Sequence, residues 1–210
     1  MEIFLDSGDP KQIKRWLPFI DGITTNPSIL KKDGSSVDKI LTWVPKGFCV
    51  SVEAVPPFVD EARDWGLIPG VAVKIPLLNS DGSNNLDVIK ELSADGININ
   101  CTALFSLGQA ILVAKAGAKF VSLFGGRIDD EGGDQFEIIR QTSDFLWDSD
   151  LDAKIIVGSI RAVSQVAGSL DAGAHIVTLP PAILEKMLVH RYSIETARQF
   201  ENDAKALVKK

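Results

Sequence analysis

The sequence predicts a single eight-stranded β/α (TIM) barrel followed by a C-terminal helix, because short apolar segments alternate with amphipathic segments along the chain. The apolar segments lie at residues 2–6, 22–26, 48–54, 71–76, 96–102, 119–124, 154–158 and 175–180. Regular alternation of short strands with helices is typical of a parallel α/β sheet. Eight strands favour a closed barrel, and no G-x-G-x-x-G motif follows the first segment to indicate a dinucleotide-binding sheet.

The segments between the expected strands show the period of a helix. Amphipathic stretches of this kind lie at residues 10–19, 85–95, 106–116, 136–147, 163–172 and 182–187, and a C-terminal helix is expected over 194–209. Ala-Gly, Asp-Gly or Pro-Gly pairs precede several strands, and glycine there is a common helix stop. No linker or change in composition divides residues 1–210, so we expect one catalytic domain.

Composition and charge disfavour some classes of protein. With 45% hydrophobic and 24% charged residues, the chain resembles ordinary globular proteins. Its net charge of −6 disfavours nucleic-acid binding, which needs concentrated Lys and Arg, but leaves room for a local phosphate pocket. No segment reaches membrane-spanning length and no leader is visible, so we expect a soluble cytoplasmic protein. Cys49 and Cys101 are expected to be buried free thiols.

Residue parity predicts which side chains point into the barrel. Residues two apart share one face of a strand, and the face toward the helices must be apolar. In the segment 96–102, Asn100 and Thr102 lie opposite an apolar face, and Ser122 shares a face with Phe124 in the next segment. Polar groups gather toward the strand ends, where barrel active sites lie. They are Asp6, Asn26, Glu53, Lys74, Asn100 and Thr102.

Lys74 is the residue on which the functional prediction depends. It stands between Val73 and Ile75 on the inward face of an expected core strand, where a lysine is costly unless it is paired. A structural ion pair with Glu53 or Asp6 is one explanation. The other is imine chemistry, because desolvation and nearby cations lower the pKa of a lysine and supply the free amine of a Schiff base.

The other candidates fit the same chemistry. Asp6 and Glu53 offer two carboxylates, and carbon–carbon cleavage through an imine needs proton transfers at two oxygens. Asp6 alone fits a helix N-cap equally well. Asn26 and Asn100 can donate and accept, as a hydroxyl-rich substrate requires, although Asn26 before Pro27 also fits turn chemistry.

Three further residues predict a phosphate site, whereas metal chemistry lacks support. Arg127, Ser159 and Arg161 follow the sixth and seventh strands and together would hold a phosphate by charge-assisted hydrogen bonds, although an isolated loop arginine is usually a solvated surface residue. The two histidines, His175 and His190, have no metal-ligand spacing. The acidic run 129–134 does not match a calcium loop and is expected to be solvated. We therefore expect no metal and no cofactor.

Seven segments resemble, in order and spacing, the small transaldolase and fructose-6-phosphate aldolase family. They are LDSGD, GITTNPS, VSVEA, VAVKIP, INCTALFS, LFGGRID and VGSIRA, and together they span essentially the whole chain. The resemblance implies a cofactor-free, class I aldolase-type barrel that acts on phosphorylated sugars of the pentose phosphate pathway. It also implies a homo-oligomer of the ring-shaped kind, in which the C-terminal helix packs on a neighbour.

The resemblance also implies a role for each candidate. Lys74 would form the Schiff base, and Asp6 would be the acid/base at the substrate hydroxyl. Glu53 and Thr102 would position a water that relays protons. The dihydroxyacetone portion would be bound by Asn26, Asn100 and Ser122, and the phosphate by Arg127, Ser159 and Arg161.

Two positions favour transaldolase within this family. Glu53 and Phe124 stand where the aldolase branch typically has Gln and Tyr, whereas Gly125 and Ile160 replace bulkier family residues near the phosphate. We therefore expect transfer of a dihydroxyacetone unit from sedoheptulose 7-phosphate or fructose 6-phosphate to an aldose phosphate. The alternatives are an aldolase that releases free dihydroxyacetone and a non-catalytic sugar-phosphate-binding barrel.

Overall fold

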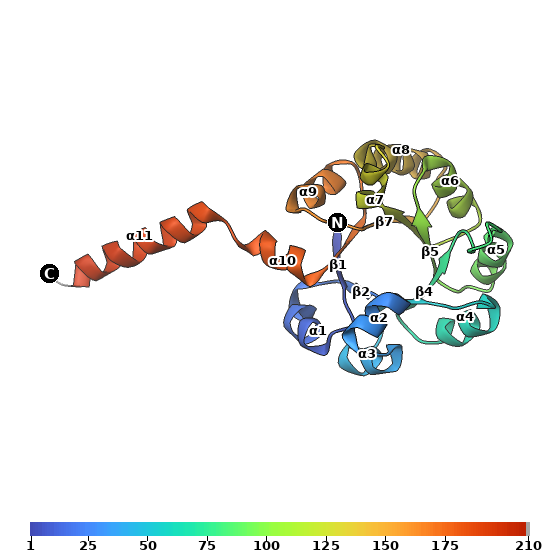
Figure 1. The fold of residues 1–210 in the computed structure, drawn as a ribbon, viewed down its shortest axis with the longest axis horizontal. Helices are drawn as coiled ribbons and strands as arrows, with labels where there is room; N and C mark the ends of the chain where they lie inside the picture. Colours follow the sequence, from blue (N-terminus) through green and yellow to red (C-terminus); the bar gives the residue numbers. More distant parts are fainter. Residues whose placement is uncertain (209–210) are drawn as a thin grey trace.

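Eight parallel strands form a closed barrel in the computed structural model, which describes residues 1–208 (Figure 1). The strands are β1 (Glu2–Asp6), β2 (Gly22–Thr24), β3 (Cys49–Glu53), β4 (Val71–Pro76), β5 (Ile99–Leu104), β6 (Phe120–Phe124), β7 (Lys154–Gly158) and β8 (Ile176–Leu179). They follow one another in sequence order around the barrel, and β8 pairs with β1. The predicted fold class is confirmed.

Helices surround the strands. They are α1 (Pro10–Trp16), the 3-10 turn η1 (Leu17–Phe19), α2 (Pro27–Asp33), α3 (Val37–Trp43), α4 (Phe58–Gly66), α5 (Leu86–Ala94), α6 (Leu107–Lys115), α7 (Gly125–Asp130), α8 (Gln135–Asp148), α9 (Val163–Asp171), α10 (Pro181–Leu188) and α11 (Arg191–Val208). Each amphipathic stretch singled out in the sequence is helical. The C-terminal helix is α11; residue 209 of its predicted range lies outside the described residues.

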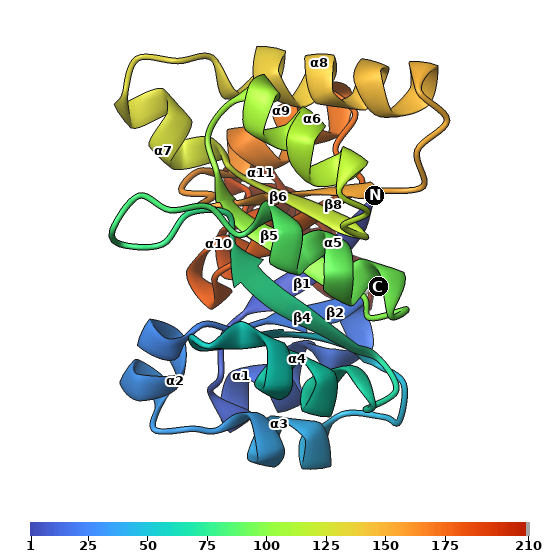
Figure 2. The same cartoon turned by 90° about the vertical axis from the view of Figure 1, so that its right-hand side faces the viewer.

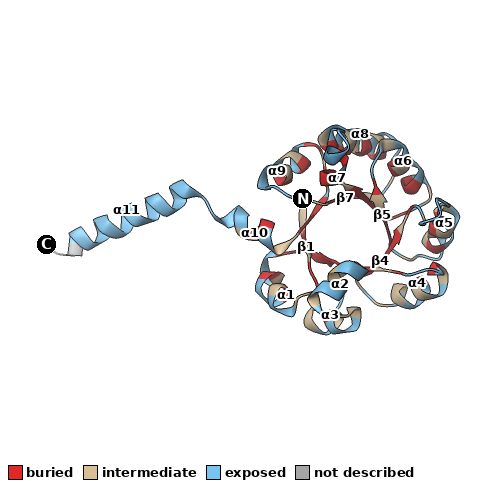
Figure 3. Cartoon of the chain, in the orientation of Figure 1, coloured by how far each residue is buried: buried red, intermediate tan, exposed pale blue. Residues whose placement is uncertain are grey.

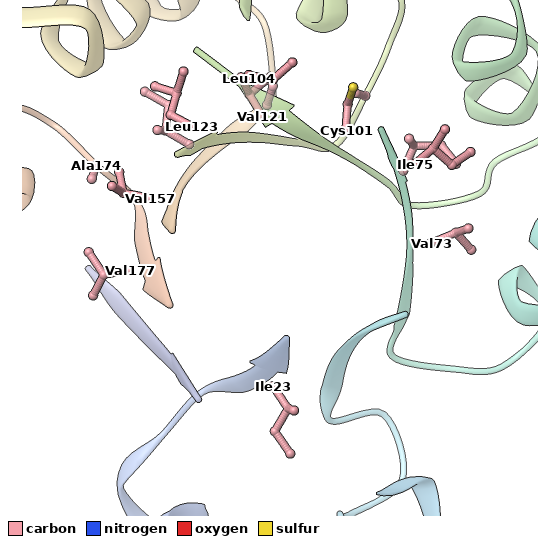
Figure 4. Packing of buried hydrophobic residues seen from close by; sticks show 14 of the residues in the cluster. Ile23, Val73, Ile75, Cys101, Leu104, Val121, Leu123, Val157, Ala174 and Val177 are labelled. Atoms are coloured by element: carbon pink, nitrogen blue, oxygen red, sulfur yellow. The ribbon is translucent and has the colours of Figure 1, made fainter. Parts of the chain in front are cut away.

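Most of the apolar core lies between the strands and the helices. Figure 4 shows Ile23, Val73, Cys101 and Val121 pointing outward from the ring of strands, and all four are fully buried. Because this outer face is apolar, the alternate residues on each strand face the barrel interior. The core therefore fixes the direction of the inward side chains that make up the site.

The barrel interior is polar only near the carboxyl ends of the strands. Its floor is closed by the buried side chains of Phe4, Ile156 and Ile176, against which Cys49 and Phe120 pack. Gly22 makes room for Phe4, since a Cβ at this position would lie 2.7 Å from the ring. The polar groups thus gather toward the strand ends, as the sequence predicts, and the opposite half of the interior is apolar.

The cysteines are both free, and their burial differs. Cys101 is buried in the outer core as predicted, but Cys49 at the barrel floor is only half-buried, which corrects the sequence-based expectation. Cys49 is the first residue of β3, so it lies at the amino end of the barrel, where it packs against the floor.

The two ends of the barrel differ. In Figure 2 the β4 arrow points to the side on which α2 and α7 lie, and the chain begins at the opposite side. α11 extends away from the barrel (Figure 1), and Figure 3 shows it exposed along its length. Within residues 1–208, no helix is both long enough and apolar enough to span a bilayer.

Candidate active site

A cavity of about 170 Å³ lies at the carboxyl ends of the barrel strands. Nine of the eleven predicted site residues line it: Asp6, Asn26, Lys74, Asn100, Thr102, Ser122, Phe124, Arg127 and Ser159. The remaining two lie close to lining residues. Glu53 contacts Lys74, and Arg161 follows Ser159 in the loop after β7.

Lys74 projects inward from the middle of β4 and is 6% exposed. Its Nζ donates to the carbonyl oxygen of Thr25 at 3.1 Å and lies 3.3 Å from Glu53 Oε2. The ion pair considered from the sequence is therefore present, and it is formed with Glu53. The same geometry directs a primary amine at the cavity, where a bound carbonyl carbon could reach it.

Asp6 ends β1 beside this amine. Its Oδ1 accepts a hydrogen bond of 2.8 Å from Thr24 Oγ1. Burial raises the pKa of the Asp6 carboxyl above its ordinary value, while the Thr24 hydrogen bond and the positive charge of Lys74 act in the opposite direction. A carboxyl with a raised pKa is suited to exchange protons with a substrate. Asp6 is not an N-cap, because Asp9 caps α1.

A buried hydrogen-bond chain fixes the polar wall opposite Asp6. Asn100 Nδ2 donates to Ser51 Oγ at 2.8 Å, and Ser122 Oγ donates to Asn100 Oδ1 at 2.7 Å. These bonds set the orientation of the Asn100 amide. Thr102 Oγ1 nearby is buried without a protein partner in the described part of the chain, so its hydroxyl is free to bind a ligand.

Asn26 serves the fold and the cavity together. Its Oδ1 accepts from Ile29 N at 2.9 Å and caps α2, which begins at Pro27. The structural role of Asn26 is therefore a helix N-cap rather than the turn considered from the sequence. Because the cap uses only the side-chain oxygen, the amide N–H groups remain available on the cavity side.

One side of the cavity carries cationic and aromatic side chains. The guanidinium carbon of Arg127 lies 5.2 Å from the centroid of the Phe124 ring, and Phe105 meets that ring edge-on at 5.8 Å. Ser159 has a φ of 60°, a strained conformation for a residue with a Cβ. Gly126 allows this loop to approach, because a Cβ there would lie 2.2 Å from Ser159 O.

Arg161 does not line the cavity. Its Nη1 and Nη2 atoms form a fork with the Asp130 carboxylate at 2.5 and 2.7 Å, and both side chains are 51% exposed. The Arg161 guanidinium lowers the pKa of Asp130. The acidic run 129–134 is exposed, as predicted, and three of its carboxylates also form bonds: Asp130 binds Arg161, Asp129 accepts from Gln135, and Asp134 caps α8.

Four cavity residues were not singled out from the sequence. They are Thr24, Ile156, Gly158 and Thr178. Parity was a usable signal for Thr24, which lies two residues before Asn26, and for Thr178, a lone hydroxyl in an apolar strand. Ile156 and Gly158 carry no chemical signal and define only the cavity wall.

The cavity combines the groups that imine chemistry requires. A buried amine, two carboxyls, oriented amide and hydroxyl groups, and a cationic edge together suit a polyhydroxy carbonyl compound that carries an anion. Within residues 1–208, no group of three or more His, Cys, Asp or Glu side chains is placed to hold a metal ion.

Barrels of other activities share the fold. Inosine 5′-monophosphate dehydrogenase from Legionella pneumophila superposes with a TM-score of 0.61 at 12% sequence identity, over 87% of this chain and 58% of that one. A mandelate oxidase superposes with a TM-score of 0.61 at 11% identity, over 85% of this chain and 64% of that one. At these identities the likeness concerns the fold alone.

Other proteins are similar to this chain in sequence as well as in fold. The family described as Transaldolase/Fructose-6-phosphate aldolase matches residues 3–210. A probable transaldolase of Nitrosopumilus maritimus is 41% identical over 203 residues, which cover 90% of this chain and 88% of the relative. A probable transaldolase of Alkaliphilus metalliredigens is 34% identical, with 100% of both chains covered.

Proposed function

The chain belongs to the transaldolase/fructose-6-phosphate aldolase family, and we propose that it moves a dihydroxyacetone unit from a ketose phosphate to an aldose phosphate. Sedoheptulose 7-phosphate or fructose 6-phosphate is the donor. The observation that carries this proposal is the inward amine of Lys74, which is 6% exposed at the wall of a polar cavity. Residues 1–210 are proposed to act as one catalytic domain in the cytoplasm.

The reaction begins at Lys74. Its free amine attacks the C2 carbonyl of the ketose, and loss of water from the carbinolamine leaves a protonated imine. Glu53, 3.3 Å from the amine, and the Thr102 hydroxyl, which has no partner among residues 1–208, are proposed to hold the water that carries protons in this step. Asn26, Asn100 and Ser122 are proposed to bind the hydroxyl groups of the dihydroxyacetone portion.

Asp6 then acts as the acid/base. It takes the proton of the C4 hydroxyl, the C3–C4 bond breaks, and its electron pair moves to the imine to give an enamine. The aldose phosphate leaves as an aldehyde. The enamine carbon attacks the aldehyde of the acceptor, Asp6 returns the proton to the new hydroxyl, and water releases the ketose from Lys74.

The phosphate is proposed to bind at the cationic side of the cavity. Arg127 and Ser159 line the cavity itself. Arg161 would add its remaining donors, because the Asp130 fork occupies only Nη1 and Nη2 on one edge of the guanidinium.

Phe124 supports transfer over release. Its ring lines the cavity and contacts Arg127 and Phe105, and it offers no proton to the enamine on Lys74. Early protonation would free dihydroxyacetone, which is the reaction of the alternative aldolase. With an apolar ring at this position, the enamine should persist until an aldehyde arrives.

The test compares transfer with release. Fructose 6-phosphate alone should give little free dihydroxyacetone, whereas added erythrose 4-phosphate should yield sedoheptulose 7-phosphate and glyceraldehyde 3-phosphate much faster. Lys74→Arg, which keeps the charge but forms no imine, serves as the inactive control. Equal rates of release and transfer would instead support the aldolase.

We also propose a homo-oligomer in which α11 packs on a second copy of the chain. Phe200 and Leu207, seven residues apart and therefore on one side of this helix, are 66% and 75% exposed. An isolated helix of this length is marginal in water. Phe200→Asp should therefore lower the mass measured by analytical ultracentrifugation, whereas Asn202→Asp on the opposite side should not. An unchanged mass in Phe200→Asp would contradict the proposal.

A further inference from the structure

Thr178 and Thr24 form a buried hydroxyl pair next to the proposed acid/base carboxyl. Their Oγ1 atoms lie 2.5 Å apart, and the residues are 8% and 3% exposed. Thr24 Oγ1 is also 2.8 Å from Asp6 Oδ1. Thr24 stands on β2 and Thr178 on β8, the two strands that flank β1.

The fold sets the direction of the Thr178 hydroxyl. A Cβ on Gly158 would lie 3.4 Å from Thr178 Cγ2, so the methyl group of Thr178 faces β7. The hydroxyl is left on the side of β1, where it meets Thr24. A β-branched side chain has few alternative χ1 rotamers in a strand, and this arrangement therefore persists.

The number of available protons determines which hydroxyl of the pair donates and which accepts. Each hydroxyl has one proton, and an ionised carboxylate only accepts. The Thr24 proton therefore goes to Asp6, and the Thr178 proton goes to Thr24. Donation to the Thr24 oxygen strengthens the bond that Thr24 makes to Asp6. When Asp6 is protonated and donates to Thr24, Thr24 can turn its proton to Thr178, and the chain reverses.

We propose that Thr178 is a positioning residue that acts through Thr24 to orient Asp6 and to favour its ionised form. The inference rests on the proposed function, in which Asp6 moves a proton at the substrate hydroxyl. Thr24 holds one oxygen of Asp6, and Thr178 is the donor that keeps the Thr24 proton aimed at that oxygen.

Charged groups around Asp6 act at longer range. Lys74 from β4 and Lys32 from α2 favour the ionised carboxyl, and Asp33 from α2 opposes it. Among the described residues, the side chain that forms a hydrogen bond with the Asp6 carboxyl is that of Thr24. A change at Thr178 would leave these three charges in place, so its effect on Asp6 would report the hydroxyl pair alone.

The experiment compares Thr178→Val, which keeps the shape, with Thr178→Ser, which keeps the hydroxyl. Thr142→Val is the matched control, because Thr142 is a buried threonine whose hydroxyl donates to Ile138 O at 2.7 Å in α8. Two quantities are measured for each variant: the pH profile of kcat/KM for transfer, and the carboxyl titration of Asp6 by ¹³C NMR in the free protein.

Thr178→Val should lower kcat about fivefold, the change that corresponds to one ordinary hydrogen bond, with little change in KM. Because hydrogen bonds to an ionised group are the stronger ones, the acidic limb of the pH profile and the Asp6 titration should both move to higher pH. Thr178→Ser should restore both, and Thr142→Val should change neither.

Two results would contradict, respectively, the role of Thr178 and the proposed function. An Asp6 titration in Thr178→Val that matches the unaltered protein would overturn the role of Thr178, whatever happens to kcat. Absence of turnover in the unaltered protein, together with a shifted Asp6 titration in Thr178→Val, would refute the proposed function and support the coupling.

Discussion

Replacing Arg127 by Ala should weaken binding of phosphorylated substrates selectively. Arg127 lines the cavity and stacks on Phe124, without a carboxylate partner in the part of the chain that the structure describes. Its donors are therefore open to an incoming phosphate. Arg161 differs, because Asp130 already binds one edge of its guanidinium.

The size of the effect follows from these contacts. Charge-assisted hydrogen bonds contribute about 1.5–3 kcal/mol, and the exposed position of Arg127 favours the lower end. A loss of about 1.4 kcal/mol corresponds to a tenfold change. We therefore expect Arg127→Ala to raise KM for fructose 6-phosphate about tenfold, with a smaller rise for Arg161→Ala.

The assay measures transfer from fructose 6-phosphate and from unphosphorylated fructose to the same acceptor. KM for fructose should hardly change in either variant, because no phosphate is lost. Arg140→Ala, which removes a surface arginine paired with Glu137 on α8, is the control. Equal losses on both donors would refute the reasoning and indicate that Arg127 serves folding.

Three further outcomes are expected. Phe124→Tyr should increase release of free dihydroxyacetone relative to transfer, and an unchanged ratio by product analysis would remove Phe124 from the subclass argument. Asp6→Asn should abolish transfer yet raise Tm at pH 7. The pKa of Asp6 in the folded protein is raised above its ordinary value of 3.8. The stability that the protonated carboxyl contributes is therefore full below 3.8 and is lost as the pH rises through the folded pKa. Calorimetry at pH 7 and pH 3.5 should show the gain only at the higher pH. Burial raises the pKa of Cys49 to about 11 and that of Cys101 to about 12, so the native protein should react slowly with iodoacetamide at pH 8, and rapid labelling of Cys101 would contradict its burial.

Local patterns predicted the strands and most inward side chains. Parity assigned Lys74, Asn100 and Ser122 to the interior, because the outer face of each strand must be apolar against the helices. β2 nevertheless ends at Thr24, two residues before its predicted end, because Asn26 leaves the ladder to cap α2. A cap of this kind competes with the strand in a way that apolar alternation does not reveal.

Short helices, and contacts between segments that are distant in the sequence, could not be predicted from local patterns. The helices α2, α3, α4 and α7, which have 7, 7, 9 and 6 residues, were not singled out from the sequence. Segments of this length give only a weak helical period. The Arg161–Asp130 fork joins the loop after β7 to the end of α7, and only the closed barrel fixes the relative position of these two segments. The Thr24–Thr178 pair similarly requires β8 to close against β1.

Borohydride trapping shows whether Lys74 forms an imine with the substrate. The protein is incubated with fructose 6-phosphate, reduced, digested, and analysed by mass spectrometry for the modified lysine. Lys74 should carry the reduced adduct, whereas Lys154, which is bound to Glu2 at the opposite end of the barrel, should not. An adduct on another lysine, or transfer activity that proceeds with no trapped adduct on Lys74, would contradict the imine mechanism.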